Sequence, residues 1–140
     1  MYPILKAKDM DKTDIIVVDD DKLVGELTRN VLEHSGFSVR LVPDSRNALS
    51  LIGQTSPKLV IADIMLPGIS GLELCNRITS DPALAGVKVM IMSAKAFDTE
   101  IRRARAFGAL HFLVKPFSKE ELLDAVNALL CRREPSPRAS

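Results

Sequence analysis

The fold of this chain is decided by the stretch Leu59-Val60-Ile61-Ala62-Asp63-Ile64-Met65-Leu66-Pro67-Gly68. Its first four residues form an apolar run without alternating polar positions, which is typical of a strand covered on both faces, as in a parallel sheet. The run closes with one carboxylate, Asp63, and a proline–glycine turn follows. Three other apolar runs also end in polar side chains. These are Asp19-Asp20-Asp21 after residues 15–18, Ser93 after residues 89–92, and Lys115-Pro116 after residues 112–114.

Apolar, β-branched runs recur at steps of about 21 to 28 residues, the length of one strand, one helix and two short loops. The intervening segments show helical spacing, for example over residues 23–32, where Gly36 is placed to end the helix. The last segment opens with Ser118 and Glu121, the pattern of a capping box. We therefore predict an α/β fold, a (βα)5 doubly wound five-stranded parallel sheet with helices on both faces. The predicted strands are residues 15–18, 37–42, 59–62, 87–92 and 110–114.

The chain has 140 residues, of which 46% are hydrophobic, which suits a single domain with a core that needs no metal or disulfide. We expect a lead-in over residues 1–13, the folded domain over 14–131, and a flexible tail or linker stub over 132–140. The formal net charge is only +1, so the composition offers no general attraction to nucleic acid or to an anionic membrane. We therefore expect neither direct nucleic-acid binding nor membrane association.

The cysteines and histidines do not form a metal-binding pattern. Cys75 and Cys131 lie far apart, and with only His34 and His111 beside them a zinc site is not expected. Cys75 falls in a helical pattern and is expected to be a small, partly buried thiol, with a disulfide as the alternative. Residues 1–8 are too short and too often interrupted for a signal peptide, so we expect a cytoplasmic location.

Acidic residues end two of the predicted strands. Because the carboxyl ends of parallel strands share one edge of the sheet, we expect Asp19, Asp20 and Asp63 to lie together. Clustered carboxylates repel unless a hard cation neutralises them, and oxygen ligands are the preference of Mg²⁺, for which Mn²⁺ is a plausible substitute. Taken alone, Asp20 or Asp21 could merely cap the helix that begins near Lys22, and Asp63 could be an ordinary turn residue.

The remaining polar residues at this edge suit phosphoryl chemistry. A carboxylate beside Mg²⁺ can attack a phosphoryl group and form an aspartyl phosphate. Lys115 supplies a fixed cation, Ser93 a hydroxyl donor and Ala94 a backbone amide. Alone, Lys115 would be a solvated lysine and Ser93 an ordinary loop residue. A cis Lys115–Pro116 bond, which the proline permits, would aim the ammonium inward.

Together these residues resemble the receiver domain of bacterial two-component response regulators. The resemblance covers residues 13–132, nearly the whole chain, and implies the strand order 2-1-3-4-5. Each of its sequence motifs is weak alone, but all four in this order and at these spacings are specific. They are Val17-Val18-Asp19-Asp20-Asp21, the stretch 63–71, Met92-Ser93-Ala94 and Val114-Lys115-Pro116-Phe117.

The resemblance implies a role for each matching residue. Asp63 would be the phosphoacceptor, Asp20 would bind Mg²⁺ directly and Asp19 through water. Asp63 and the backbone carbonyl of Met65 would complete the metal ligands. Ser93, the Ala94 amide and Lys115 would contact the phosphoryl group, and Ser93 with Phe112 would form the switch. Phe112 could equally be a core residue, and the two roles are compatible.

The resemblance also implies a mechanism and partners. A histidine kinase or phosphotransfer protein would donate the phosphoryl group, shifting the surface of the fourth helix, fifth strand and fifth helix. A partner protein or output domain would read that surface, and phosphorylation could also drive homodimerisation. The domain would be a phosphorylation-activated signalling switch rather than an enzyme, catalysing only the phosphorylation and dephosphorylation of its own Asp63.

Several alternatives stay open. The domain could be a constitutive interaction module that takes no phosphate, or an aspartyl-phosphate phosphatase. Met65 stands where such phosphatases usually place a second acid, and it cannot orient a water, so slow self-dephosphorylation is expected. Gly108-Ala109-Leu110-His111-Phe112 departs from the Gly-Ala-Asp-Asp-Tyr of winged-helix members, which puts their charged dimer interface in doubt. Arg102, Arg103 and Arg105 form either a solvated face or a docking patch for an acidic partner.

Overall fold

The computed structural model describes residues 12–95 and 97–130. The predicted tail over 132–140, most of the predicted lead-in, and Cys131 lie outside these residues, so those domain limits stay predictions. Within the described ranges, no helix has the length and apolar character needed to cross a membrane.

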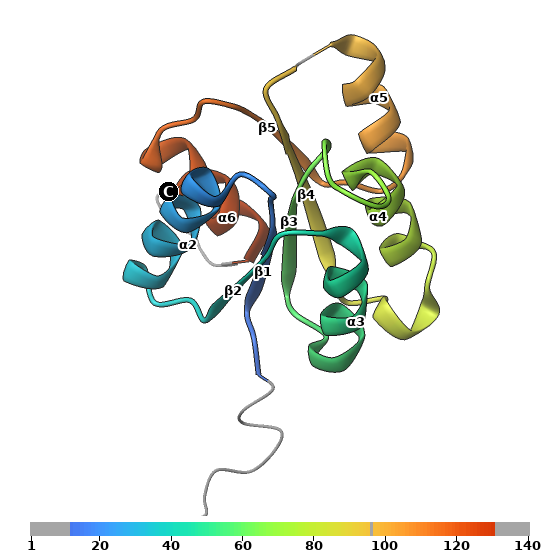
Figure 1. Cartoon of the computed structure of the whole chain (residues 1–140), viewed down its shortest axis with the longest axis horizontal. Coiled ribbons are helices and arrows are strands. Elements are labelled where there is room, and N and C mark those ends of the chain that lie inside the picture. The colour runs from blue at the N-terminus through green and yellow to red at the C-terminus, as the bar shows by residue number, and fades with distance from the viewer. Residues whose placement is uncertain (1–11, 96, 131–140) are drawn as a thin grey trace, which may run out of the picture.

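Five parallel strands form one sheet in the order β2-β1-β3-β4-β5, which confirms the predicted fold and strand order (Figure 1). Register follows the apolar runs: Val18 of β1 pairs with Ala62 of β3, and Asp63 pairs with Met92 of β4. The carboxyl ends of these strands therefore meet at one edge. The strands are β1 (Ile15–Val18), β2 (Val39–Val42), β3 (Leu59–Asp63), β4 (Lys88–Ser93) and β5 (His111–Val114).

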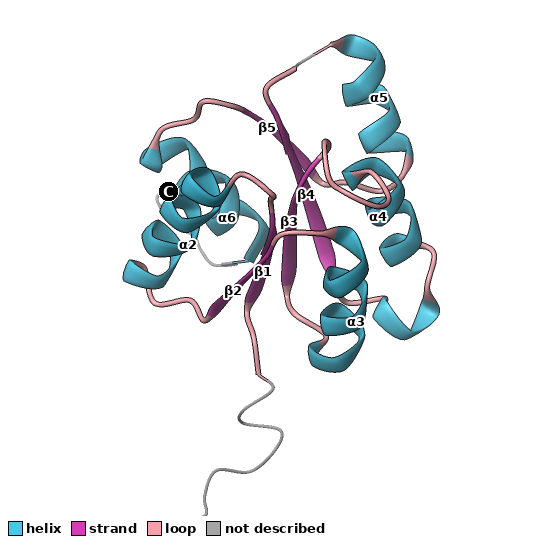
Figure 2. Cartoon of the chain, viewed as in Figure 1, coloured by secondary structure: helices cyan, strands magenta, loops and turns pink. Residues whose placement is uncertain are grey.

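Helices cover both faces of this sheet, as Figure 2 shows. Two helices, α2 and α6, pack together on one face, and α3, α4 and α5 lie on the other. A short 3-10 helix, η1 (Pro82–Leu84), precedes β4 and was not predicted. The helices span α2 (Lys22–His34), α3 (Ser45–Thr55), α4 (Gly71–Thr79), α5 (Asp98–Ala106) and α6 (Lys119–Leu130).

The sheet separates two apolar cores. Val60 and Ala62 of β3 point into the core beneath α3, α4 and α5, while Leu59 and Ile61 point into the core beneath α2 and α6. All five residues of β3 are buried, as expected for the central strand of a doubly covered sheet. Burying each large aliphatic side chain contributes about 1.5–3 kcal/mol, so the strand that carries Asp63 is held firmly.

Capping residues mark the starts of α2 and α6 where the sequence predicted them. The side chain of Asp21 accepts a hydrogen bond from the amide of Val24, so Asp21 does cap α2. Ser118 and Glu121 form the reciprocal bonds of a capping box at α6. The predicted second strand begins at Val39 rather than residue 37, because the amide of Phe37 bonds to the carbonyl of Leu32 and closes α2 instead.

Candidate functional site

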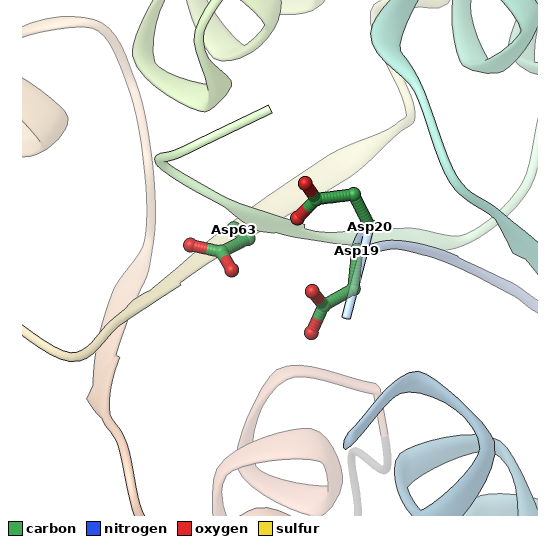
Figure 3. Close-up of side chains that lie close together, drawn as sticks. All are labelled: Asp19, Asp20 and Asp63. Atoms are coloured by element: carbon green, nitrogen blue, oxygen red, sulfur yellow. The ribbon is translucent and has the colours of Figure 1, made fainter. Parts of the chain in front are cut away.

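Three carboxylates from two strand ends lie close together at the carboxyl edge of the sheet (Figure 3). Asp19 and Asp20 follow β1, and Asp63 ends β3. One oxygen from each lies within 4.8 Å of the others. Asp19 and Asp63 are buried, whereas Asp20 is exposed. The cluster is therefore open to solvent at Asp20 and enclosed by the protein at Asp19 and Asp63.

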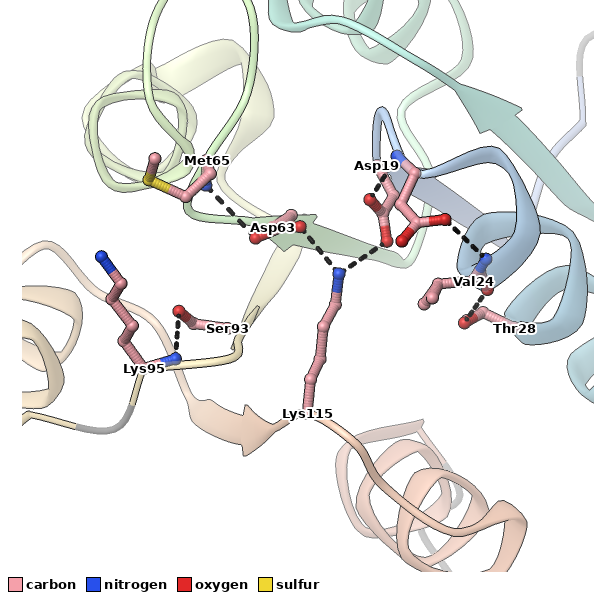
Figure 4. Close-up of polar contacts among 9 residues, drawn as sticks. Asp19, Val24, Thr28, Asp63, Met65, Ser93, Lys95 and Lys115 are labelled. Carbon is pink, nitrogen blue, oxygen red and sulfur yellow. Dashed lines mark hydrogen bonds and ion pairs between the residues drawn. The ribbon is translucent and has the colours of Figure 1, made fainter.

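Lys115 reaches this cluster from the loop after β5 (Figure 4). Its ammonium donates to Asp63 Oδ2 at 2.7 Å and to Asp19 Oδ2 at 3.0 Å. The backbone amide of Lys115 donates to the carbonyl of Ser93 at 2.8 Å, which ties the loop to β4. The Lys115–Pro116 peptide bond is cis, the isomer that the sequence permitted. One side chain thus joins residues that are 96 and 52 positions away in the sequence.

The electrostatics of the cluster favour an added cation. Three carboxylates face one ammonium, a formal balance of −2. Burial raises the pKa of Asp19, against the opposing effects of the Asp21 amide and of Lys115. Burial alone would lower the pKa of Lys115, but its hydrogen bonds to Asp63 and Asp19 outweigh burial and raise it. Mg²⁺ prefers hard oxygen donors with surplus negative charge, and these three carboxylates supply such donors.

Backbone amides hold the two buried carboxylates from behind. Asp63 Oδ1 accepts from the amide of Met65 at 3.2 Å, and Asp19 Oδ1 accepts from the amide of Asp21 at 2.9 Å. The side chain of Met65 is 65% exposed and makes no part of the core. Met65 therefore lies at the site through its backbone, while its thioether faces solvent.

Ser93 lies at the same edge but is not engaged with the carboxylates. It ends β4 and is buried, and its hydroxyl accepts a hydrogen bond from the amide of Lys95 at 3.1 Å. Among the described contacts, no hydrogen bond joins Ser93 to Asp63 (Figure 4). Ala94 is exposed beside it. Ser93 therefore lies at the carboxyl end of β4 and Ala94 directly after it, with the Ser93 hydroxyl turned to its own loop.

Phe112 lies away from the carboxylates, in β5. Its ring is partly buried against the core beneath α3, α4 and α5. It also lines a small cavity of about 40 Å³ with Ile101 and Ala104 of α5. The sequence left both a core role and a switch role open, and the packing is compatible with both.

Gly71 has a close contact with Asp63 that the sequence did not reveal. A Cβ at Gly71 would lie 2.0 Å from the backbone carbonyl oxygen of Asp63, and the Gly71 amide donates to the carbonyl of Ile64 at 2.8 Å. No side chain fits there. The available signal was a glycine directly after Ser70, the residue that caps α4.

An apolar groove between α2 and α6 borders the site. Its volume is about 520 Å³, and Val24, Leu27 and Phe117 are among its lining residues, with Lys115 at one end. The groove holds none of the three carboxylates. It therefore adjoins the candidate site and is not the site itself.

Comparison with known proteins identifies the family. Residues 15–127 match the model of the response regulator receiver domain. The chain is 38% identical over 125 residues to the response regulator MprA of Mycolicibacterium vanbaalenii, covering 89% of this chain and 53% of MprA. It is 34% identical over 123 residues to the DNA-binding response regulator MtrA of Mycolicibacterium smegmatis, covering 88% of this chain and 53% of MtrA.

A solved structure agrees with these sequence relatives. A putative response regulator from Chloroflexus aurantiacus superimposes with a TM-score of 0.81 at 31% identity, over 86% of this chain and 99% of that one. The chain therefore belongs to the response regulator receiver domains, the phosphoacceptor modules of two-component signal transduction. Receiver domains generally bind Mg²⁺ at an acidic pocket, and in this chain Asp19, Asp20 and Asp63 form an acidic cluster.

The comparisons correct one expectation. The chain spans about half the length of the curated relatives it matches, and MtrA is a DNA-binding regulator. The expectation that nucleic-acid binding is absent was wrong. It rested on the net charge of +1, and the charge of a receiver domain says nothing about an output segment.

Proposed function

We propose that this domain is a phosphorylation-activated switch in which Asp63 accepts a phosphoryl group from a histidine kinase or phosphotransfer protein. The observation that carries the proposal is the buried carboxylate of Asp63, bonded to Lys115 at 2.7 Å and within 4.8 Å of two further carboxylates. Phosphoryl transfer requires a nucleophile that is held beside a fixed cation and beside a group that can bind a further cation.

Asp19, Asp20 and Asp63 would hold Mg²⁺, with the backbone carbonyl of Met65 as a fourth protein ligand. When bound, the ion would neutralise charge on the carboxylates and on the phosphoryl oxygens. Asp19, the most buried of the three acids at 1% exposure, would contact the ion through a water. Exposed Asp20 has freedom to turn toward the ion.

In the transfer step an oxygen of Asp63 attacks the phosphorus of a phosphohistidine. The new O–P bond forms as the P–N bond breaks, and the imidazole nitrogen of the donor keeps the electron pair and takes a proton from solvent. Lys115 would then pair with a phosphoryl oxygen in place of one carboxylate contact. The Ser93 hydroxyl would exchange the Lys95 amide for a phosphoryl oxygen, with the Ala94 amide as a further donor.

This exchange would convert the local charge into a change of surface. The loop after β4 would move toward Asp63, and the Phe112 side chain would occupy a different part of the space between α5 and β5. A partner or output segment would read the surface of α5, β5 and α6. By likeness to MtrA, DNA-binding regulation is among the outputs that such a surface would control in a longer protein.

Incubation with acetyl phosphate and Mg²⁺, followed by intact-mass measurement, tests the proposal. One phosphoryl adduct that requires Mg²⁺ and is absent from Asp63→Ala is the expected result. If the wild-type protein gains no adduct from acetyl phosphate or from any histidine kinase tried, the domain is a constitutive interaction module. Steady release of inorganic phosphate without a lasting adduct would instead indicate the phosphatase.

A further inference from the structure

Ser45 is a buried polar residue to which the proposed mechanism assigns no role. It is the first residue of α3 and is only 1% exposed. Its side chain does not serve its own helix, because Asp44 caps α3 by accepting from the amide of Asn47. Instead the hydroxyl reaches the loop between β3 and α4, residues 64–70, which follows Asp63 directly.

The hydroxyl of Ser45 makes two hydrogen bonds to this loop. It donates to the carbonyl of Pro67 at 2.9 Å and accepts from the amide of Ile69 at 2.8 Å. Gly68, between them, has a φ of +90°, and a Cβ there would lie 2.7 Å from Ser45 Oγ. The loop backbone therefore closes directly over the hydroxyl.

These two hydroxyl bonds hold the middle of the loop, together with the longer bond that the Ser45 amide donates to the Pro67 carbonyl at 3.5 Å. Other backbone contacts hold the ends of the loop. At the start, the amide of Ile64 donates to the carbonyl of Met92, and the amide of Met65 donates to Asp63 Oδ1. At the end, the amide of Gly71 donates to the carbonyl of Ile64. Within the described contacts, Ser45 is the side chain from outside the loop that bonds to residues 66–69.

We infer that Ser45 is a positioning residue for the Asp63 site, an inference that rests on the proposed function. By fixing residues 67–69 its hydroxyl sets where the loop backbone runs, and hence where the amide and carbonyl of Met65 lie. The exposed Met65 side chain contributes no packing that could do this from the other side. Mg²⁺ requires near-ideal ligand geometry, so a loosened loop weakens ion binding before it affects the nucleophile.

Ser45→Ala removes both hydrogen bonds of the Ser45 hydroxyl, to Pro67 and Ile69. Thr55→Ala is its matched control. Thr55 lies at the other end of the same helix and loses one hydroxyl bond, to the carbonyl of Leu51 at 2.8 Å, without touching the loop. Mg²⁺ is titrated into each protein and followed by amide chemical shifts, and the acetyl phosphate reaction is timed at low and at saturating Mg²⁺. Loss of an outer partner of a metal ligand typically weakens binding at least tenfold, so a Kd raised about tenfold is expected for Ser45→Ala.

The separate effects on Mg²⁺ affinity and on the phosphorylation rate distinguish a positioning role of Ser45 from a purely stabilising one. The rate of Ser45→Ala at saturating Mg²⁺ should stay within about twofold of wild type, because the loss falls on ion binding. Amide hydrogen exchange should quicken at Met65, Leu66, Gly68 and Ile69 and not in β1 or β3. Equal Mg²⁺ affinity in Ser45→Ala and Thr55→Ala overturns the inference, and so does a Ser45→Ala protein that is unfolded. If wild type gains no adduct, the proposed function fails first, whatever Ser45→Ala does.

Discussion

The two sides of the candidate site differ in how far they are assembled. On the acidic side, the buried carboxylates of Asp63 and Asp19 are joined to the half-buried Lys115 by direct hydrogen bonds of 2.7 and 3.0 Å. On the hydroxyl side, Ser93 bonds to the amide of Lys95, in its own loop, at 3.1 Å. In the proposed mechanism, the acidic side would be assembled before a phosphoryl group arrives, and the hydroxyl side would have to exchange a hydrogen-bond partner. This difference suits a switch, because recognition needs a fixed site and signalling needs a movable one.

The largest effect is expected from breaking the assembled side. Lys115→Ala removes the cation that pairs with Asp63 and Asp19, and loss of one preorganised donor typically slows a reaction about 10²–10³-fold. Phosphorylation by acetyl phosphate should fall by about that factor, measured by intact mass over time. Lys115→Arg keeps the charge and should retain more of the rate. A Lys115→Ala rate equal to wild type would show that the ion pair is structural only.

The close contact behind Asp63 should give the next largest effect. Gly71→Ala places a methyl group 2.0 Å from the Asp63 carbonyl oxygen, and such overpacking typically costs about 1–3 kcal/mol or more in the free energy of unfolding. Gly53→Ala is the control, because Gly53 lies in the last turn of α3 and a Cβ there meets nothing within 4 Å. That change should stabilise by up to about 1 kcal/mol. Urea unfolding of both variants checks the contrast, and equal stabilities would contradict it.

Changes on the unassembled side should affect the phosphorylated state more than the fold. Ser93→Ala removes only the bond from the exposed Lys95 loop, so the free energy of unfolding should change by about 1 kcal/mol or less. On phosphorylation, however, Ser93→Ala should lack the chemical shift changes at Phe112 that are expected of wild type. Ser93→Thr keeps the hydroxyl and should preserve them. A full response in Ser93→Ala would place the switch elsewhere.

Met65, whose amide bonds to Asp63, should tune how long the phosphoryl group lasts. Met65 is 65% exposed, and its thioether cannot orient an attacking water. Met65→Asn should therefore shorten the lifetime of the adduct by a few-fold, followed by intact mass after removal of acetyl phosphate. Met65→Leu, which is also apolar, should leave the lifetime unchanged. If Met65→Asn loses phosphate no faster than wild type, slow self-dephosphorylation does not depend on this side chain.

The smallest effect concerns Cys75, which is remote from both sides and reports on the core. Burial raises the pKa of the Cys75 thiol from 9.0 to about 11. The folded protein thus holds this proton where the unfolded chain releases it, and stability falls as the pH rises from about 9 to 11. In a Cys131→Ser background, iodoacetamide should leave Cys75 unmodified at pH 8 until urea unfolds the protein. Rapid labelling of the folded protein would mean that the core opens locally.

Much of this arrangement could be predicted from the sequence because local patterns carry it. Continuous apolar runs such as 59–62 predict strands buried on both faces, and the capping residues Asp21 and Ser118 predict where helices begin. In a parallel sheet the carboxyl ends of strands share an edge, so Asp19 and Asp63 had to meet there. The charge balance was a poor guide by comparison, since it led to the wrong expectation about nucleic acid.

Contacts between distant loops were decided only by the tertiary structure. The sequence placed Lys115 at the correct edge of the sheet but did not identify its hydrogen-bond partners, Asp19 and Asp63. It also gave no sign that Ser45 bonds to a loop 22 residues further on. Nor did it show that Ser93 turns to Lys95, or that Gly71 lies against the Asp63 carbonyl. Strand periodicity fixes which residues share an edge. Bond partners within that edge depend on loop path and side-chain rotamer, which differ by a few ångströms that no local pattern encodes.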